Sequence, residues 1–176
     1  MTSGHSLIVT MASEEDAREL AVLRTAVADD LTRQYGHGHW SAIVTESGER
    51  QSLKTSRILV ARDDDRTIIA TLRLAIKKPW AIDKTYFTDV RRPLYLTDMA
   101  VAPRLQRCGI GRRLLEEART VALDWPGDAI RLDAYDHAAG AGPFYGKAGF
   151  HEVGRVTYRG VPLIYFELLL PARGAT

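Results

Sequence analysis

The sequence predicts a single α/β domain over residues 1–176, in which helices flank a mixed sheet. Segments of β-branched and apolar residues alternate, in the second half of the chain, with segments that repeat apolar residues at helical spacing. The order is strands first, then strand, helix, strand, helix and two strands, which is typical of a mixed α/β sheet. With 176 residues, 45% of them hydrophobic, the chain can bury one sizeable core.

The N-terminal part is expected to hold one strand and one helix. Residues 7–11 form an apolar, β-branched run that predicts a strand. Ser13 and Asp16 have the spacing of a capping-box variant, which predicts a helix that continues to about Val27. The segment 35–50 is polar and contains glycines, so we expect it to be partly helical at most.

A hairpin and a long loop are expected next. The runs 57–62 and 67–76 are rich in β-branched and apolar residues and flank the acidic turn 63–65, which is the pattern of two paired strands. The segment 77–93 is long and polar and contains three aromatic residues. Long loops in compact domains are usually functional or disordered, so this segment is expected to be one or the other.

The second half begins with a strand over 95–101, a glycine loop and a helix that ends at about Asp124. Apolar side chains of this helix fall on one face, which predicts that one side is buried. The run Trp-Pro-Gly at 125–127 stops the helix. The remaining expected elements are a strand at 129–135, a helix at about 140–148 that ends at Gly149, and two strands at 150–158 and 161–169 joined by a turn at Arg159 and Gly160.

Charge and composition exclude several classes of protein. The formal net charge is +2, from 24 basic and 22 acidic residues, so no charge excess favours binding to nucleic acid or to a membrane surface. The N-terminus lacks the features of a signal peptide, and the longest apolar stretch, interrupted by Glu167, is too short to span a bilayer. Cys108 is the only cysteine, which excludes an internal disulfide and fits a reducing compartment. We therefore expect a cytoplasmic protein with no nucleic-acid or membrane partner.

Two glycines, Gly109 and Gly111, lie where the second-half helix is expected to begin. A helix N-terminus offers up to four unpaired N–H groups and about half a positive charge, which suits a phosphate group. The ATP-binding pattern GxxxxGK[ST] is absent, and the dinucleotide pattern GxGxxG would need a glycine at Leu114. What remains is the run from Gln106 to Gly111, which has the form (Q/R)-x-x-G-x-(G/A) after a strand and a proline-containing turn.

Two motifs together resemble the GNAT superfamily of acyl-CoA-dependent N-acetyltransferases. The first is YLTDMAVAPRLQRCGIGRRLLEEA, which is similar to the family's pyrophosphate loop. The second is RLDAYDHAAGAGPFYGKAGFHEVG, which is similar to its strand–helix motif ending in FYxKxGF, and the two cover about residues 94–154. The resemblance implies a GNAT-like fold with a mostly antiparallel sheet, acetyl-CoA as acyl donor, and a small-molecule or peptide amine as acceptor. It also implies direct transfer in a ternary complex.

The resemblance further implies how this chain holds acetyl-CoA. Backbone groups of the strand, near a bulge, would pair with the pantetheine arm, and amide groups of the glycine loop would wrap the pyrophosphate. Ala138 departs from the family pattern, which often has asparagine there, so a side-chain hydrogen bond to the cofactor arm is missing. The residues that the resemblance assigns to the cofactor are Met99, Ala100, Val101, Gln106, Arg107, Cys108, Gly109, Ile110, Gly111 and Arg112.

Acetyl transfer from a thioester to an amine needs a neutral amine, a stabilised oxyanion and a proton for the departing thiolate. A lysine-like amine has a pKa of about 10.4 and must lose a proton, whereas a phenol is protonated at pH 7 and can donate one. In proteins that look like this one, the tyrosine at the position of Tyr145 lies beside the thioester sulfur. Tyr145 is therefore the expected proton donor, and a backbone N–H near Met99 or Ala100 is the expected oxyanion partner.

The base that accepts the amine proton is left open among several groups. Asp98 is the leading candidate, because similar enzymes place acidic residues at this point of the strand. Tyr95 and Asp133 are alternatives, and so is a water relay without a dedicated base. Thr97 stands where some relatives have an acidic residue.

Other residues are expected to have smaller roles. Tyr35 and Trp40 follow the first helix and are expected to border the acceptor site. His37 and His39 lack cysteine or glutamate partners at ligand spacing, so no metal site is expected. The apolar last strand, LIYFELLL, is explained equally well by the core and by pairing across a homodimer.

Two rival interpretations of the function stay open. A non-catalytic acyl-CoA-binding sensor on the same fold is favoured by Ala138 and by the ambiguous base, and it predicts acetyl-CoA binding without turnover. A nucleotide-binding module of another class is disfavoured, because neither nucleotide fingerprint is complete.

Overall fold

The helices and strands of the protein follow the order that the sequence predicts, with one regular helix added. The structure is a computed structural model that describes residues 7–172. In chain order the elements are β1 (Ile8–Met11), α1 (Ala17–Tyr35), α2 (Glu46–Thr55), β2 (Arg57–Arg62), β3 (Ile68–Ala75), β4 (Pro93–Val101), α3 (Ile110–Asp124), β5 (Ala129–Tyr135), α4 (Gly142–Lys147), β6 (His151–Tyr158) and β7 (Val161–Leu169), with short 3-10 turns at Glu14–Asp16, Lys84–Tyr86 and Pro103–Leu105.

The strands within residues 7–172 form one sheet in the order β1-β2-β3-β4-β5-β7-β6. The pairs β1–β2, β5–β7 and β6–β7 are antiparallel, whereas β4 and β5 run parallel. The predicted α/β fold, with a mixed and mostly antiparallel sheet flanked by helices, is confirmed. None of the helices in this part of the chain combines the length and the apolar content needed to cross a membrane.

By its internal contacts the chain divides into two units. The first unit runs up to Arg73 and includes Asp98–Glu117. The second unit comprises Leu74–Thr97 and the chain from Ala118 onward. Strand β4 therefore contributes residues to both units, and Asp98 is the first residue of its part in the first unit.

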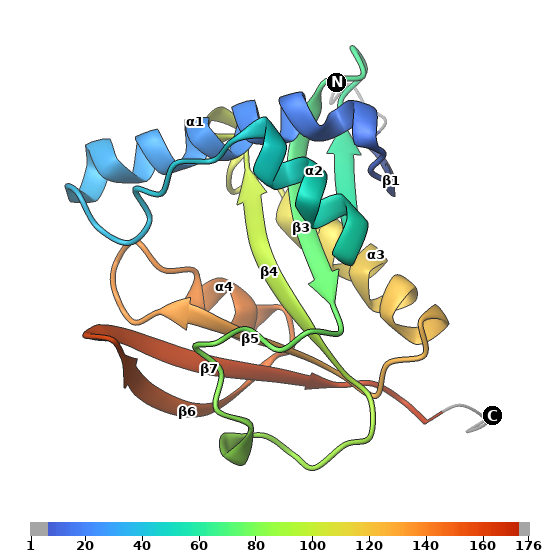
Figure 1. Cartoon of the computed structure of the whole chain (residues 1–176), viewed down its shortest axis with the longest axis vertical. Coiled ribbons are helices and arrows are strands. Elements are labelled where there is room, and N and C mark those ends of the chain that lie inside the picture. The colour runs from blue at the N-terminus through green and yellow to red at the C-terminus, as the bar shows by residue number, and fades with distance from the viewer. Residues whose placement is uncertain (1–6, 173–176) are drawn as a thin grey trace. The chain divides into compact units, whose positions relative to one another are not determined.

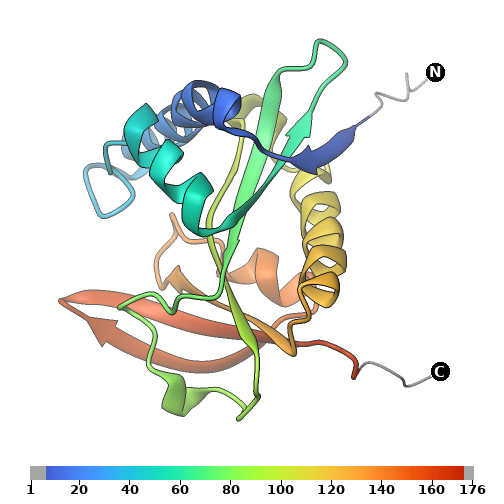
Figure 2. The ribbon, with the colours of Figure 1, turned by 45° about the vertical axis from the view of Figure 1, so that its right-hand side comes forward.

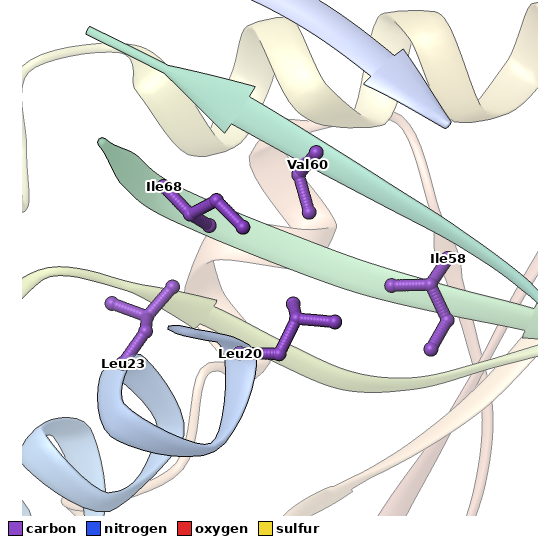
Figure 3. Close-up of a cluster of buried hydrophobic side chains, with 5 residues drawn as sticks. All are labelled: Leu20, Leu23, Ile58, Val60 and Ile68. Carbon is purple, nitrogen blue, oxygen red and sulfur yellow. The ribbon is translucent and has the colours of Figure 1, made fainter. Parts of the chain in front are cut away.

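In the first unit, α1 packs on the strands through a small apolar core (Figure 3). Leu20 and Leu23 of α1 face Ile58 and Val60 of β2 and Ile68 of β3, and all five side chains are buried. β1 extends this unit by pairing with β2. The helices α1 and α2 lie side by side in both ribbon views (Figures 1 and 2).

Helix α1 starts as predicted but is longer than predicted. Ser13 and Asp16 form the capping box, in which the Ser13 N–H donates to Asp16 Oδ2 at 2.9 Å. The helix continues to Tyr35 rather than to about Val27, because no glycine or proline interrupts it before Gly36. Gly36 has a φ of +80° and ends the helix, since glycine adopts this conformation without strain.

Helix α2 differs from the prediction, which allowed at most a partial helix up to residue 50. Its sequence, ESGERQSLKT, is polar and carries no apolar stripe, so hydrophobic periodicity does not reveal it. Local polar interactions support it instead. The Thr45 hydroxyl oxygen accepts from the Gly48 N–H at 3.1 Å, and Arg50 lies 2.7 Å from Glu46 one turn away.

In the second unit, β6 and β7 form the long antiparallel hairpin at the red end of the ribbon (Figure 1). The predicted turn residues Arg159 and Gly160 have φ values of +50° and +80°. The pairing of β6 with β7 is irregular between Glu152 and Gly154. A Cβ atom at Gly154 would lie 2.3 Å from the ring of Tyr86, so the missing side chain makes room for that ring.

The long segment between β3 and β4 is held in place by side chains of the sheet. The hydroxyl group of Tyr165 on β7 accepts from the Asp83 N–H at 3.1 Å and donates to the carbonyl oxygen of Ala81. The rings of Phe87 and Tyr165 pack with their centroids 5.3 Å apart. This part of the predicted loop therefore has a fixed conformation against β7.

A buried ion pair holds the same segment farther along the chain. Arg131 of β5 and Glu167 of β7 are both 3% exposed, and Nε of the arginine lies 3.0 Å from Oε2 of the glutamate. Arg131 also donates to the carbonyl oxygen of Thr88, and the Thr88 N–H donates to Glu167 Oε1 at 3.1 Å. The pair thus satisfies both backbone groups of one loop residue.

Candidate active site

The glycine loop after β4 presents backbone amides that the helix does not use. Arg107 and Gly109 have φ values of +63° and +81°, in the left-handed region. The first backbone hydrogen bond into α3 runs from the Arg113 N–H to the carbonyl oxygen of Gly109 at 3.1 Å, so the amides from Ile110 to Arg112 precede the helical ladder. Unpaired N–H groups beside left-handed residues are one of the backbone arrangements that bind anions.

Side chains attach this loop to the end of β4 and add positive charge. Gln106 Nε2 donates to the carbonyl oxygen of Val101 at 3.1 Å, and Cys108 Sγ contacts the Gln106 carbonyl oxygen at 3.5 Å. Arg112 pairs with a glutamate one turn on at 3.6 Å. Arg107 is exposed and forms no ion pair with a carboxylate of the described chain, so its charge is available to a ligand.

Strand β4 changes conformation at Asp98, immediately before its predicted cofactor-binding residues. Asp98 has a φ of +55°, which a residue other than glycine seldom adopts. Ala100 is buried, whereas Met99 and Val101 are half-buried. This is the point of the strand where the resemblance implies a bulge.

The Asp98 carboxylate is bound by two arginines of the first unit. Its Oδ1 accepts from Nη2 of Arg24 in α1 at 2.8 Å, and its Oδ2 lies 3.1 Å from Nη2 of Arg73 in β3. Arg24 also pairs with the buried Glu49 of α2, and Arg73 donates to the Ser52 hydroxyl oxygen at 2.7 Å. We call these five residues the Asp98 cluster. It connects α1, α2, β3 and β4 through charge-assisted hydrogen bonds.

Sequence reasoning missed Arg24, Arg73 and Glu49 as members of the site. Arg24 is 25 positions from Glu49 and 74 positions from Asp98. A charged residue on a polar helix is interpreted as part of a solvated face. No local motif marks these residues, and only the fold brings them together.

Tyr145 lies in α4 of the second unit and is buried, with 6% of its surface exposed. Its ring packs against Phe150 and Phe166 at centroid distances of 5.7 and 6.0 Å. Burial, and next the charge of Asp133, raise the pKa of Tyr145 well above its ordinary value. The phenol is therefore protonated at neutral pH, as a proton donor must be.

The other two predicted bases also lie in the second unit. Tyr95 is 2% exposed and packs in a core cluster with Ile82, Phe87 and Tyr165. Asp133 of β5 stands opposite Tyr165 in the strand register and is half-buried. Burial raises the pKa of Asp133, and a hydrogen bond from its own backbone N–H opposes this in part.

The residues after α1 form an aromatic contact. The rings of Tyr35 and Trp40 meet edge to face with centroids 6.4 Å apart, and Trp40 Nε1 donates to the carbonyl oxygen of Gly36 at 2.9 Å. His37 and His39 belong to no group of three histidine, cysteine or acidic side chains that could hold a metal ion within residues 7–172.

Solved structures of acetyltransferases share this fold. A ribosomal-protein-alanine N-acetyltransferase from Brucella melitensis has a TM-score of 0.70 at 20% identity, over 93% of this chain and 99% of that one. A GNAT acetyltransferase from Streptococcus pneumoniae has a TM-score of 0.70 at 20% identity, over 94% and 100% of the two chains. An acetyltransferase from Salmonella typhimurium, solved with its cofactor acetyl-CoA, has a TM-score of 0.69 at 15% identity, over 97% and 98%.

The match to a family model goes beyond the fold. Among curated proteins, none matches the sequence. The model for the acetyltransferase (GNAT) domain matches residues 54–152, which is more than half of the chain and includes the glycine loop and Tyr145. The chain belongs to the GNAT acetyltransferase family and is an acyltransferase, an enzyme of the kind that takes its acyl group from acetyl-CoA.

Proposed function

We propose that this enzyme transfers the acetyl group of acetyl-CoA directly to a primary amine, with both substrates bound at once. The observation that carries the proposal is the loop from Arg107 to Arg112, which has left-handed residues at Arg107 and Gly109 and amides from Ile110 to Arg112 outside the helical ladder, as an anion site needs. The pyrophosphate of acetyl-CoA is such an anion. The proposed catalytic domain spans the whole chain, because the family match over residues 54–152 takes in parts of both units.

The end of β4 is the proposed binding site for the pantetheine arm and the thioester of acetyl-CoA. Backbone groups of Met99 and Val101 would pair with the pantetheine arm, and an N–H at Met99 or Ala100 would donate to the oxyanion. The carbonyl oxygen of Val101 accepts from Gln106 Nε2 at 3.1 Å. Gln106 therefore links the loop that binds phosphate to the strand that binds the arm.

Tyr145 is the proposed proton donor to the departing thiolate. A thiol has a pKa of about 8.5, so its thiolate leaves more readily when a proton is supplied. Burial of Tyr145 among Phe150 and Phe166 holds the ring in place and raises the pKa of the phenol, which is therefore fully protonated before the reaction.

For Asp98 and Tyr95 we propose supporting roles. Both oxygens of the Asp98 carboxylate are engaged, Oδ1 by Arg24 and Oδ2 by Arg73. Its proposed role is to keep β4 in the left-handed turn that leads into Met99. Tyr95 is proposed to support β4 from the core of the second unit.

The acceptor is proposed to be a small molecule or a peptide that carries a primary amine. Cys108 is an exposed free thiol in the loop that would bind the pyrophosphate. Because such a thiol survives best under reducing conditions, we propose the cytoplasm as the compartment.

A non-catalytic acyl-CoA sensor is the second candidate function. Ala138 favours it, since an alanine cannot supply the side-chain hydrogen bond to the cofactor arm that the family often has. The sensor would bind acetyl-CoA and release no thiol with any amine. The enzyme would bind acetyl-CoA and would also release the CoA thiol when it is given a suitable amine.

The test is a thermal-unfolding titration followed by a turnover assay. A ligand that binds only the folded protein raises the unfolding midpoint, so acetyl-CoA and CoA are compared with ATP and NAD. Release of free CoA thiol is then measured with a panel of primary amines. Stabilisation by both CoA species together with thiol release supports the enzyme. Stabilisation without release of CoA thiol supports the sensor. If neither CoA species stabilises the protein, the proposed binding site for acetyl-CoA is wrong.

A matched pair of glycine variants tests the loop itself. Gly109→Ala and Gly36→Ala place a methyl group on backbones of nearly the same φ, +81° and +80°, and neither Cβ would meet an atom within 4 Å. Both variants should lose about 1–3 kcal/mol of stability through backbone strain, since a residue other than glycine is disfavoured at both positions. Only Gly109→Ala should weaken acetyl-CoA binding, because only it disturbs the loop amides. Equal acetyl-CoA affinity in the two variants would contradict the role of the loop.

A further inference from the structure

A cavity of about 400 Å³ lies in the second unit, where β4 begins. Four cations line it, Lys78, Lys84, Arg91 and Arg92, and none of its described wall residues is acidic. The rest of the wall is apolar or aromatic and includes Trp125, which follows the end of α3. Small-molecule sites have volumes of about 300–1,000 Å³, so this cavity has the size of such a site.

The cavity shares no residue with the proposed binding site for acetyl-CoA. That site is assigned to residues 99–101 and 106–112, at the end of β4 and in the loop after it. The cavity uses the first residues of β4 and the segment that precedes them. Acetyl transfer as proposed above therefore leaves these four cations without a role.

Two of the four cations are held in place by the fold. Lys78 Nζ donates to the carbonyl oxygens of Pro79 and Ile82 at 2.9 and 2.6 Å, which uses two of its three N–H donors. Arg92 Nη2 lies 3.1 Å from Asp128 Oδ1, and the backbone N–H of the arginine donates to Asp128 Oδ2 at 2.8 Å. Groups that are already positioned cost a ligand little ordering entropy when it binds.

The other two cations, Lys84 and Arg91, are exposed to solvent. Within residues 7–172, neither of them forms an ion pair with a carboxylate. Their charges are therefore available to a ligand, and their replacement removes no ion pair of the described chain.

The balance of charge leaves the cavity positive. The carboxylates on which its cations act are Asp83 and Asp128, and neither lines the cavity. Hydrogen bonds from Thr85 lower the pKa of Asp83, and a hydrogen bond from Arg92 lowers the pKa of Asp128, so both groups are ionised at neutral pH. Four cations less two carboxylates leave a charge of about +2, which balances the charge of about −1.5 to −2 on a phosphomonoester at pH 7.

The apolar part of the wall suits a flat ring. Ile76, Leu94, Trp125 and Pro126 contribute to it, and Ile76 leaves 64% of its surface exposed. An indole ring is a surface on which another aromatic ring can stack, and arginine side chains also stack on aromatic faces. A ligand that combines a ring with a phosphate would therefore contact both parts of the wall.

We infer that this cavity binds a phosphomonoester that carries an aromatic ring, and that its ligand class is the nucleoside monophosphates. The cations hold the phosphate, for which the planar guanidinium groups supply paired donors. The apolar wall takes the base. This is a second ligand site, and it does not depend on the proposed acetyl transfer.

The experiment is a calorimetric titration of AMP into the full chain in the presence of saturating acetyl-CoA, which occupies the proposed acetyl-CoA site. We expect AMP to bind under these conditions. Adenosine lacks the phosphate and ribose 5-phosphate lacks the base, so each should bind about 10-fold or more weakly than AMP. The same titration without acetyl-CoA should give the same affinity for AMP.

A matched set of variants locates the site. Lys84→Gln and Arg91→Gln each remove a cation that lines the cavity, and each should weaken AMP binding about 10-fold. Lys77→Gln removes an exposed cation of the same segment that does not line the cavity. This control variant should bind AMP as the wild type does.

Four results would overturn the inference. A wild type that binds no AMP has no such site. AMP binding that disappears when acetyl-CoA is added would mean that the nucleotide occupies the glycine loop. An equal loss in Lys77→Gln and Lys84→Gln would show that diffuse positive charge, and not the cavity, attracts the phosphate. Equal affinity for AMP and ribose 5-phosphate would remove the base from the site.

Discussion

Arg24 Nη2 donates to Asp98 Oδ1 at 2.8 Å, and so a side chain of α1 holds the left-handed residue of β4. A residue other than glycine in this conformation costs of order 1–2 kcal/mol. The charge-assisted hydrogen bonds from Arg24 and Arg73 offset that cost, because each is stronger than a bond between neutral groups. The Asp98 cluster therefore stabilises the backbone that leads into Met99.

The first prediction concerns this cluster. Asp98→Asn should lower the free energy of unfolding by about 1–2 kcal/mol, because hydrogen bonds to charged groups are lost. It should also weaken acetyl-CoA binding, since β4 would relax next to Met99. Chemical denaturation and a binding titration measure the two effects.

The control for Asp98 is an exposed ion pair of the same unit. Glu46→Gln breaks a pair with Arg50 in which both side chains are more than 40% exposed, 43% and 46%. Such a pair contributes about 0.5 kcal/mol or less, and acetyl-CoA binding should not change. If Asp98→Asn loses stability but binds acetyl-CoA as the wild type does, its positioning role is wrong.

The second prediction concerns Tyr145. Tyr145→Phe keeps the ring that packs on Phe150 and Phe166 but removes the phenolic proton. We expect kcat to fall by about 10²-fold, within the usual range for a lost general acid, with little change in acetyl-CoA affinity. Steady-state thiol release and a binding titration measure these quantities, and an unchanged kcat would remove Tyr145 from the mechanism.

The third prediction is a pH dependence of stability that originates at Asp133. Because the folded-state pKa of Asp133 is raised above its ordinary value of 3.8, the folded protein binds this proton more tightly than the unfolded chain does. Its contribution to the free energy of unfolding therefore decreases as the pH rises from about 4 through the raised pKa. The Asp133→Asn variant has no carboxyl group at this position, so its free energy of unfolding does not show this decrease with rising pH.

Chemical denaturation of the wild type and the variant at several pH values measures the direction of this change in the free energy of unfolding. The variant should be more stable than the wild type at neutral pH, and the difference should shrink toward acid pH. The carboxyl groups with lowered pKa values, such as those of Asp16 and Asp128, are present in both proteins and cancel in the difference. A variant that is less stable at neutral pH would show that Asp133 stabilises the fold.

The fourth prediction concerns the buried pair of Arg131 and Glu167. Glu167→Gln leaves a buried guanidinium group without its counter-charge, and this should lower the free energy of unfolding by about 3–5 kcal/mol. The double variant Arg131→Met with Glu167→Leu should recover much of that loss, because no buried charge is left unpaired. Denaturation of the wild type and the two variants measures the loss and its recovery.

Proteolysis gives a second view of the same pair. In the double variant the N–H and the carbonyl oxygen of Thr88 both lose their side-chain partners, so trypsin should cut the segment 77–92 faster at its lysines and arginines. Glu152→Gln, which weakens an exposed pair with Arg155, is the matched control and should change neither stability nor cleavage. Equal cleavage in all variants would show that other contacts hold the segment.

Local patterns predicted much of this fold. The bounds of β2, β5 and β7 agree with the expected runs at 57–62, 129–135 and 161–169, because each strand is a segment rich in apolar residues between turn residues. The loop from Gln106 to Gly111 is also one continuous motif, so the sequence pattern alone predicted its place between a strand and a helix.

The parts that the sequence did not reveal depend on distant contacts. Helix α2 has no apolar stripe, and its start rests on Thr45 and a few polar contacts. The Asp98 cluster joins residues up to 74 positions apart. The same limit applies to the bases, since Asp98 and Asp133 look alike in the sequence and differ only in which side chains surround them.

The contact between Gly154 and Tyr86 has a consequence for related chains. Any side chain at position 154 would enter the space of the Tyr86 ring, because even its Cβ would lie 2.3 Å away. A relative that carries a larger residue at the position of Gly154 must therefore have a smaller one at the position of Tyr86, or a different path for the segment before β4. The two positions are expected to vary together during evolution, although 68 residues of sequence separate them.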